Sequence, residues 1–141
     1  GPVMLIDEEL SLKKLEVFLV YMRTGNLSRA AAELETSNVS VHRAIHSLES
    51  ALRCPLFKHE GRNLTPLESA YVLEERAQKL IGDVVEQIDK IVKATRFEGW
   101  QNSNSGPREI QKALMLTLAQ FGLSKDKDLF EKAYAYIEEH Y

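Results

Sequence analysis

Residues 25–45 of the chain read GNLSRAAAELETSNVSVHRAI and contain two short helical patterns separated by a break. Asn26 and Ser28 can each accept a hydrogen bond from the free N–H groups at the start of a helix. The small or apolar residues that follow at helical spacing are Ala30, Ala31 and Leu34. The pattern predicts a short helix whose alanines allow close packing against a neighbour.

A third helix is predicted after the break. Thr36 and Ser37 interrupt the first pattern, and Ser37 can cap a new helix. Its apolar residues fall three or four positions apart, at Val41, Ile45, Leu48 and Leu52. Its other side carries the hydrogen-bonding residues Asn38, Ser40, His42, Arg43 and His46. An exposed row of such groups contributes little to a core, so we interpret it as a surface that reads a partner.

Two further elements flank this helical pair. A helix is predicted over residues 11–24, where apolar residues recur at helical spacing and Gly25 follows as a stop. Residues 56–65 alternate apolar and polar side chains around Gly61, as a short β-hairpin does. We therefore expect residues 11–65 to form a three-helix core with a hairpin wing, in a mainly α chain.

A long helix is predicted over residues 66–96. Its apolar stripe is close to heptad spacing and consists of Ala70, Leu73, Ala77, Leu80, Ile81, Val84, Ile88 and Ile91. Such a stripe can cover a core, but this one is longer than the small domain beside it. We therefore favour self-association, as a homodimer.

The remaining residues divide into a linker and a helical hairpin. Residues 97–106 are predicted to be a flexible linker, because residues 101–106 are too polar and flexible to pack. In residues 107–141, one apolar stripe consists of Ile110, Leu114, Leu118 and Phe121, and another of Phe130, Tyr134 and Ile137. Gly122 is a predicted helix stop and Ser124 a predicted cap, so these residues are expected to form two helices.

Composition limits the classes of function. The chain has 141 residues, a formal net charge of −3 and 44% hydrophobic residues, which is typical of an ordinary folded protein. The single Cys54 excludes an internal disulfide and fits a reducing cytoplasm. No apolar run is long enough for a membrane span, and we interpret Gly1-Pro2 within residues 1–10 as a cleavage scar. His42 and His46 lie four apart but have no third ligand nearby, so we expect no metal and no cofactor.

The polar face of the third helix has the chemistry of a DNA reader. A DNA major groove is about 12 Å wide and admits one α-helix. Arg43 can donate two hydrogen bonds to guanine O6 and N7, and Asn38 can pair with adenine N6 and N7. Beside them, Ser40, His42 and His46 are further candidate contacts. The residues expected to hold phosphates are Ser28, Arg29, Ser37 and Arg62.

Residues 12–96 resemble the DNA-binding domain and linker helix of LysR-type transcriptional regulators. The resemblance is carried by Leu15 and Phe18, residues 25–34 (GNLSRAAAEL), residues 37–45 (SNVSVHRAI), Leu48-Glu49, Leu56-Phe57 and Leu64-Thr65. It implies a winged helix-turn-helix and a linker helix that pairs antiparallel with its twin. The implied function is dimeric binding to a roughly palindromic DNA site.

The chain also departs from this family. It has Asn38-Val39 where the family usually has Gln-Pro, His42 where Ser is usual, a shorter wing, and His59 in place of a common Arg. The family usually continues into an α/β effector-binding domain, whereas two predicted helices follow here. Either an unrelated helical segment has been joined to the linker helix, or the chain is a short regulator with its own C-terminal module. Residues 107–141 resemble no family.

Three hypotheses of function follow from the sequence. The leading one is a cytoplasmic, sequence-specific, dimeric DNA-binding regulator without enzymatic activity. The second is a helical protein-interaction module with vestigial DNA binding, which the acidic total charge motivates. A small enzyme ranks last, because the sequence contains no pattern of a nucleophile with its base, a metal cluster or a phosphate loop.

Overall fold

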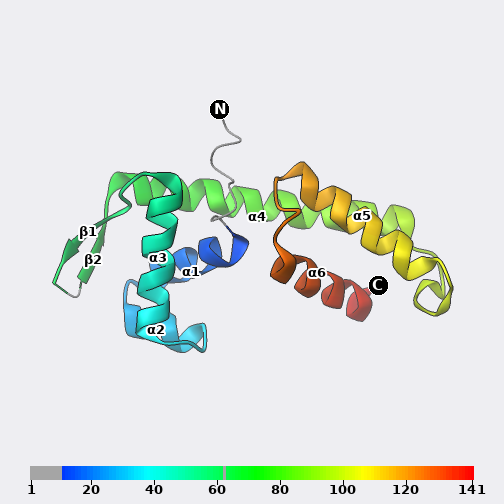
Figure 1. Cartoon of the computed structure of the whole chain (residues 1–141), viewed down its shortest axis with the longest axis horizontal. Coiled ribbons are helices and arrows are strands. Elements are labelled where there is room, and N and C mark those ends of the chain that lie inside the picture. The colour runs from blue at the N-terminus through cyan, green and yellow to red at the C-terminus, as the bar shows by residue number, and fades with distance from the viewer. Residues whose placement is uncertain (1–10, 62) are drawn as a thin grey trace. The chain divides into compact units, whose positions relative to one another are not determined.

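The computed structural model describes residues 11–61 and 63–141, and these residues are mainly helical, as predicted (Figure 1). Two compact units divide the chain within one long helix, at residues 1–79 and 80–141. Each unit is described below by itself. In the described part of the chain, no helix combines the length and apolar character needed to cross a membrane.

The first unit begins with two capped helices. Helix α1 (Leu12–Thr24) starts at Ser11, whose side chain accepts from the N–H of Lys14, and it ends at Gly25 with a φ of 68°. That left-handed conformation favours glycine, which explains the predicted stop. Helix α2 (Leu27–Glu33) is capped by Asn26, whose side chain accepts from the N–H of Arg29. Of the two predicted caps, Asn26 fills the role, and Ser28 lies inside the helix.

Helix α3 (Asn38–Leu52) is capped by Ser37, as predicted. Its inner side contributes Val41, Ile45 and Leu48, which are almost completely buried. α1 and α2 both pack against α3 and against each other. Ala30 and Ala31 of α2 are also buried, which confirms the role of the small side chains in close packing.

The predicted wing is an antiparallel hairpin of β1 (Phe57–Glu60) and β2 (Asn63–Pro66). Gly61, in the connecting turn, has a φ of 63°. The ring of Phe57 contacts Tyr21 of α1 edge-on, with centroids 5.3 Å apart. The Tyr21 hydroxyl in turn donates a 2.8 Å hydrogen bond to the carbonyl oxygen of Leu64. The base of the wing is therefore part of the core, which confirms a winged helix.

Glu49 joins α3 to the start of the wing. Its Oε2 atom accepts hydrogen bonds from the backbone N–H groups of Leu56, at 2.7 Å, and Phe57, at 3.2 Å. The other carboxylate oxygen lies 3.3 Å from Nε2 of His59. Only 11% of the Glu49 side chain is exposed, so these backbone groups have little access to water as a substitute.

The long helix α4 spans Glu68–Thr95 and starts two residues later than predicted. Pro66 instead pairs with Phe57 in the hairpin, and the N–H of Leu67 donates to the carbonyl of Leu56. Part of the predicted stripe is buried within the single chain. Ala70 and Ala77 are buried in the first unit, and Val84 is buried in the second. These positions of the stripe are therefore already used inside each unit.

The expectation of a flexible linker at residues 97–106 was wrong. Residues Trp100–Asn102 form the short 3-10 helix η2, and only 2% of Trp100 is exposed. The indole Nε1–H donates to the carbonyl oxygen of Tyr141 at 3.3 Å. Gly106 lies so close to the Trp100 carbonyl that a side chain there would collide with it. The polar composition concealed one large aromatic residue that anchors the segment.

The predicted C-terminal hairpin consists of α5 (Gly106–Gln120) and α6 (Lys127–His140), which contact each other. Its core includes Ile110, Leu114, Leu118 and Ile137, as the stripes predicted. The cap of α6 is Asp126, whose side chain accepts from the N–H of Leu129. The prediction of Ser124 as the cap was therefore wrong, because the helix begins two residues later than that cap requires.

Replacing Glu49 with Ala should lower the free energy of unfolding of the first unit by about 1.5 to 3 kcal/mol, the usual contribution of hydrogen bonds to a charged group. Urea unfolding followed by circular dichroism measures this change. Glu60→Ala is the matched control, because the one ion pair of Glu60 among the described residues is with exposed Lys58, at 3.4 Å. That pair should contribute less than about 1 kcal/mol. Equal losses in the two variants would contradict the role of Glu49.

Tyr141 should ionise only at high pH. Its hydroxyl donates to the carboxylate of Asp89, and this hydrogen bond raises the pKa of Tyr141 to about 12. The neutral phenol is favoured by folding, so its contribution to stability is complete below the usual pKa of 10 and is lost as the pH rises toward 12. Phenolate absorbance of the chain minus that of Tyr141→Phe should show a step near pH 12. A step near pH 10 would contradict this hydrogen bond.

Candidate nucleic-acid interface

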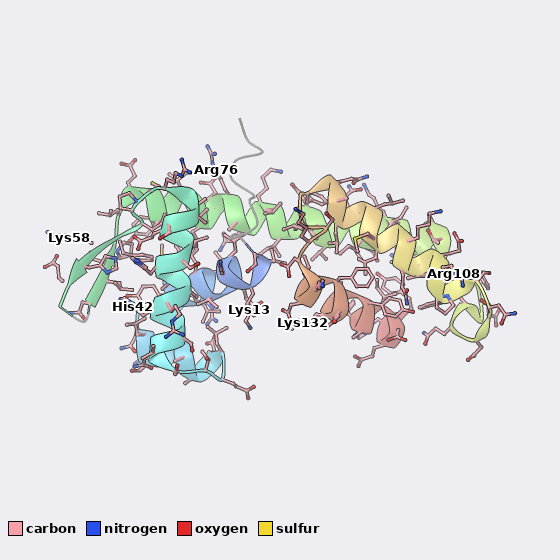
Figure 2. All side chains as sticks on the ribbon, in the orientation of Figure 1. Lys13, His42, Lys58, Arg76, Arg108 and Lys132 are labelled. Carbon is pink, nitrogen blue, oxygen red and sulfur yellow. The ribbon has the colours of Figure 1, made fainter. Side chains whose placement is uncertain are left out.

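The polar side of α3 faces solvent. All five residues assigned to it from the sequence, Asn38, Ser40, His42, Arg43 and His46, are exposed. The apolar side is buried, so one helix separates the core from a polar surface. Figure 2 shows His42 on this helix and Lys58 on the neighbouring wing. The division of the two faces agrees with the sequence analysis, and contact with DNA stays a prediction.

A hollow of about 900 Å³ lies between the start of α3 and the wing. It is lined on one side by Ser28 of α2 and by Asn38, Val39 and His42 of the first two turns of α3. Asn63 and Thr65 of β2 line it from the other. The two strand residues are exposed and alternate with buried Leu64, so the pleat directs them away from the core.

Four of the predicted site residues are held by local hydrogen bonds. The Asn38 amide nitrogen donates to the hydroxyl of Ser28 at 3.0 Å, which links α3 to α2. The Ser37 hydroxyl accepts from the N–H of Ser40 at 3.1 Å and lies 2.9 Å from the Ser40 hydroxyl. Arg29 is exposed on α2. The structure therefore brings Ser28 to Asn38 and Ser37 to Ser40.

Arg43 lies on a different part of the polar face. It follows His42 by one residue, which turns its side chain by about 100° around the helix. It lines neither hollow beside α3, and among the described residues no carboxylate forms an ion pair with it. Arg23 differs, because Glu33 binds it at 3.0 Å and the Arg23 guanidinium lowers the pKa of that carboxyl. The guanidinium of Arg43 is thus available to an external acceptor.

A second hollow, of about 500 Å³, lies farther along α3 toward the wing. It is lined by His42, His46, Glu49, Ser50, Cys54, Pro55, Phe57 and His59. The rings of His42 and His59 meet edge-on, with centroids 5.8 Å apart. Within the described ranges, no group of three or more His, Cys, Asp or Glu residues is arranged to hold a metal ion. This hollow therefore adds imidazole groups to the surface and gives no support to a metal site.

Three residues of this surface were not predicted from the sequence. Val39 is 63% exposed at the first turn of α3, although valine is usually buried. Asn63 and Thr65 line the hollow from the wing. The alternation of polar and apolar residues around Leu64 could have identified the two wing residues. For Val39, only its position after Asn38 indicated that it lies on this surface. Arg62, the predicted phosphate contact of the wing, lies outside the described residues.

The geometry suits a DNA groove. Along its exposed side, α3 offers the donors and acceptors of Asn38 and the donors of Arg43, which match base edges in a major groove. Exposed Val39 can contact a thymine methyl group, since apolar side chains recognise that group. The wing stands beside the same helix end, where it can follow the adjacent DNA backbone.

Comparison with known proteins agrees with this geometry. Residues 12–70 match the family described as bacterial regulatory helix-turn-helix protein, lysR family. The chain is 45% identical over 91 residues to the malonate utilization transcriptional regulator of Klebsiella pneumoniae, covering 64% of this chain and 28% of that protein. It is 33% identical over 75 residues to the HTH-type transcriptional regulator AdmX of Serratia plymuthica, covering 53% of this chain and 25% of that protein.

A third relative is the HTH-type transcriptional regulator GltR of Bacillus subtilis, at 28% identity over 101 residues, or 72% of this chain and 32% of that protein. The chain thus spans about a quarter to a third of the length of these relatives. The match to the family coincides with α1, α2, α3, the wing and the first turn of α4. Residues 12–70 therefore match the helix-turn-helix of the LysR family of bacterial regulatory proteins.

Proposed function

We propose that this chain binds double-stranded DNA through α3 and the wing and that it acts as a transcription regulator. The observation that carries the proposal is the exposed polar side of α3, which lies beside a wing within a LysR-family helix-turn-helix. The first turn of α3 enters the major groove, because a groove about 12 Å wide admits one helix. The function needs no enzymatic step, and its place is the cytoplasm, where the DNA lies.

Base reading falls to the exposed side chains of α3. Arg43 donates two hydrogen bonds to a guanine, and its lack of an ion pair within the described chain supports this role. Asn38 pairs with an adenine, and Ser40, His42 and His46 contact neighbouring base edges. The departures Asn38-Val39 and His42 lie in this row, so the preferred bases should differ from those of relatives with other residues there.

Phosphate contacts set the register of α3 on the DNA. The hydroxyls of Ser28 and Ser37 and the guanidinium groups of Arg29 and Arg62 are assigned to this role. Ser28, Arg29 and Ser37 are exposed, and Ser28 contacts Asn38, which supports the assignment. The net charge of −3 gives no general attraction to DNA, so these local contacts must supply the affinity.

A homodimer is proposed to present two such surfaces to an approximately palindromic site. α4 provides the candidate contact, because Ile81, Val85 and Ile88 lie four and three residues apart on one side of it. Val85 is 61% exposed, and the other two are half-buried. Pairing of α4 with its twin would remove these apolar side chains from water.

Arg43→Ala should weaken binding to the preferred duplex by about 1 to 3 kcal/mol, or roughly 5- to 150-fold, with a smaller loss on unrelated duplexes. The preferred duplex is first obtained by selecting bound sequences from a random DNA pool. Titration by fluorescence anisotropy then gives the affinities. Arg108→Ala is the matched control, because Arg108 is an exposed arginine of α5, in the second unit (Figure 2).

Two outcomes would contradict parts of this proposal. Equal loss on every sequence would make Arg43 a phosphate contact. If the wild-type chain bound no duplex even at low ionic strength, DNA binding itself would be wrong, because phosphate contacts are strongest when little salt competes.

The dimer predicts a mass twice the 16.0 kDa of the chain in light scattering at micromolar concentration. Val85→Lys should shift the mass toward that of one chain, because it places a charge among apolar side chains. Glu86→Lys is the control, since Glu86 is an exposed neighbour on another side of α4. A wild-type mass of 16.0 kDa would contradict pairing through α4.

A further inference from the structure

The hydrogen bond between Asn38 and Ser28 joins two residues to which the proposed function gives separate roles. Asn38 Nδ2 on α3 donates to Ser28 Oγ on α2 at 3.0 Å. Both residues are exposed and line the same hollow beside the wing. A candidate phosphate contact and a candidate base reader are thus in direct contact.

The orientation of an asparagine amide decides what it can read. One side of the group is an acceptor oxygen, and the other is a nitrogen with two donor protons. With Nδ2 turned to Ser28, Asn38 keeps its oxygen and one proton for a base. That pair matches adenine, which offers a donor at N6 and an acceptor at N7. Guanine offers two acceptors at the same edge, so a flipped amide would favour a different base.

A serine hydroxyl alone does not determine this orientation. It can accept from Nδ2, as in the structure, or donate to Oδ1 of a flipped amide. A DNA phosphate removes the second choice, because its oxygens only accept hydrogen bonds. Once Ser28 gives its single proton to a phosphate, only its lone pairs remain for Asn38. The amide must then turn its nitrogen toward Ser28.

We propose that Ser28 is a positioning residue that couples a backbone phosphate contact to base reading by Asn38. The inference rests on the proposed DNA binding and adds a specific dependence to it. Phosphate contact by Ser28 holds the Asn38 amide in the orientation that favours adenine over guanine. Among the described residues the Ser28 proton has no acceptor, so it is available to the phosphate.

The test measures discrimination at one base pair, and not affinity alone. The base pair that Asn38 reads is first identified as the one at which Asn38→Ala loses the preference of the wild-type chain. Affinity for the selected duplex is then compared with affinity for duplexes changed at that base pair. The discrimination ratio is the affinity for the selected duplex divided by the affinity for a duplex changed at that base pair. A good bidentate contact gives a ratio of roughly ten or more, and Asn38→Ala should bring the ratio close to one. Ser28→Ala should lower affinity on every duplex and also reduce this ratio at least threefold. The double variant, Ser28→Ala with Asn38→Ala, should show no further loss of discrimination beyond that of Asn38→Ala alone.

Matched variants separate the hydroxyl from side-chain shape. Ser28→Thr keeps a hydroxyl, whereas Ser28→Val has nearly the same shape without one. The threonine variant should retain the wild-type ratio, and the valine variant should lose it. Ser124→Ala, in the second unit, removes an exposed serine hydroxyl outside the interface and should leave both affinity and ratio unchanged. Thermal unfolding of each variant checks that the first unit is folded.

A scan of methylphosphonate substitutions locates the phosphate. At one position, the methylphosphonate should lower both the affinity and the discrimination of the wild-type chain. The same substitution should cause no further loss of either in Ser28→Ala. The coupling is wrong if Ser28→Ala and Ser28→Val weaken all duplexes while keeping the wild-type ratio, or if no phosphate changes the ratio. Those results would leave DNA binding intact, whereas a wild-type chain that binds no duplex would overturn the proposed function as well.

Discussion

Packing of the apolar side of α3 against α1 and α2 determines which of its side chains meet solvent. An α-helix repeats every 3.6 residues, so burying Val41, Ile45 and Leu48 places the intervening polar residues on the opposite side. The caps at Ser37 and Asn26 fix where α3 and α2 begin. If α3 began one residue earlier or later, every side chain would rotate by about 100° around the helix axis. Apolar core residues would then turn toward solvent in place of the polar ones.

The wing is attached to this core at several points along its base. Phe57 packs on Phe18 and Tyr21, the Tyr21 hydroxyl binds the Leu64 carbonyl, and Glu49 binds the amides before and within β1. Two-stranded hairpins have little stability by themselves, so such anchors are needed. They also hold the wing beside the first turns of α3, where β2 and α3 line one hollow.

Much of this arrangement was predictable, because helical periodicity and capping are local properties of sequence. Gly25 and Ser37 marked helix ends correctly, and the polar side of α3 followed from the spacing of its apolar residues. Contacts between distant residues were not predictable. Polar neighbours concealed Trp100, which packs against the end of the chain 41 residues later. The Ser28–Asn38 bond and the attachment of Glu49 to the wing also depend on tertiary placement that no local pattern encodes.

Charge distribution explains how an acidic chain can present a DNA-binding surface. Two acidic residues near α3 are engaged: Glu49 binds the wing and Glu33 binds Arg23, while Arg43 and the histidines of α3 remain exposed. Screening at physiological salt limits the effect of distant charges, because the Debye length is about 8 Å. At the distance of a hydrogen bond, attraction by the donors on α3 should therefore exceed the repulsion that the net charge of −3 exerts on a phosphate. We therefore expect hydrogen bonds that orient these few donors, such as the one between Asn38 and Ser28, to influence recognition more than total charge does.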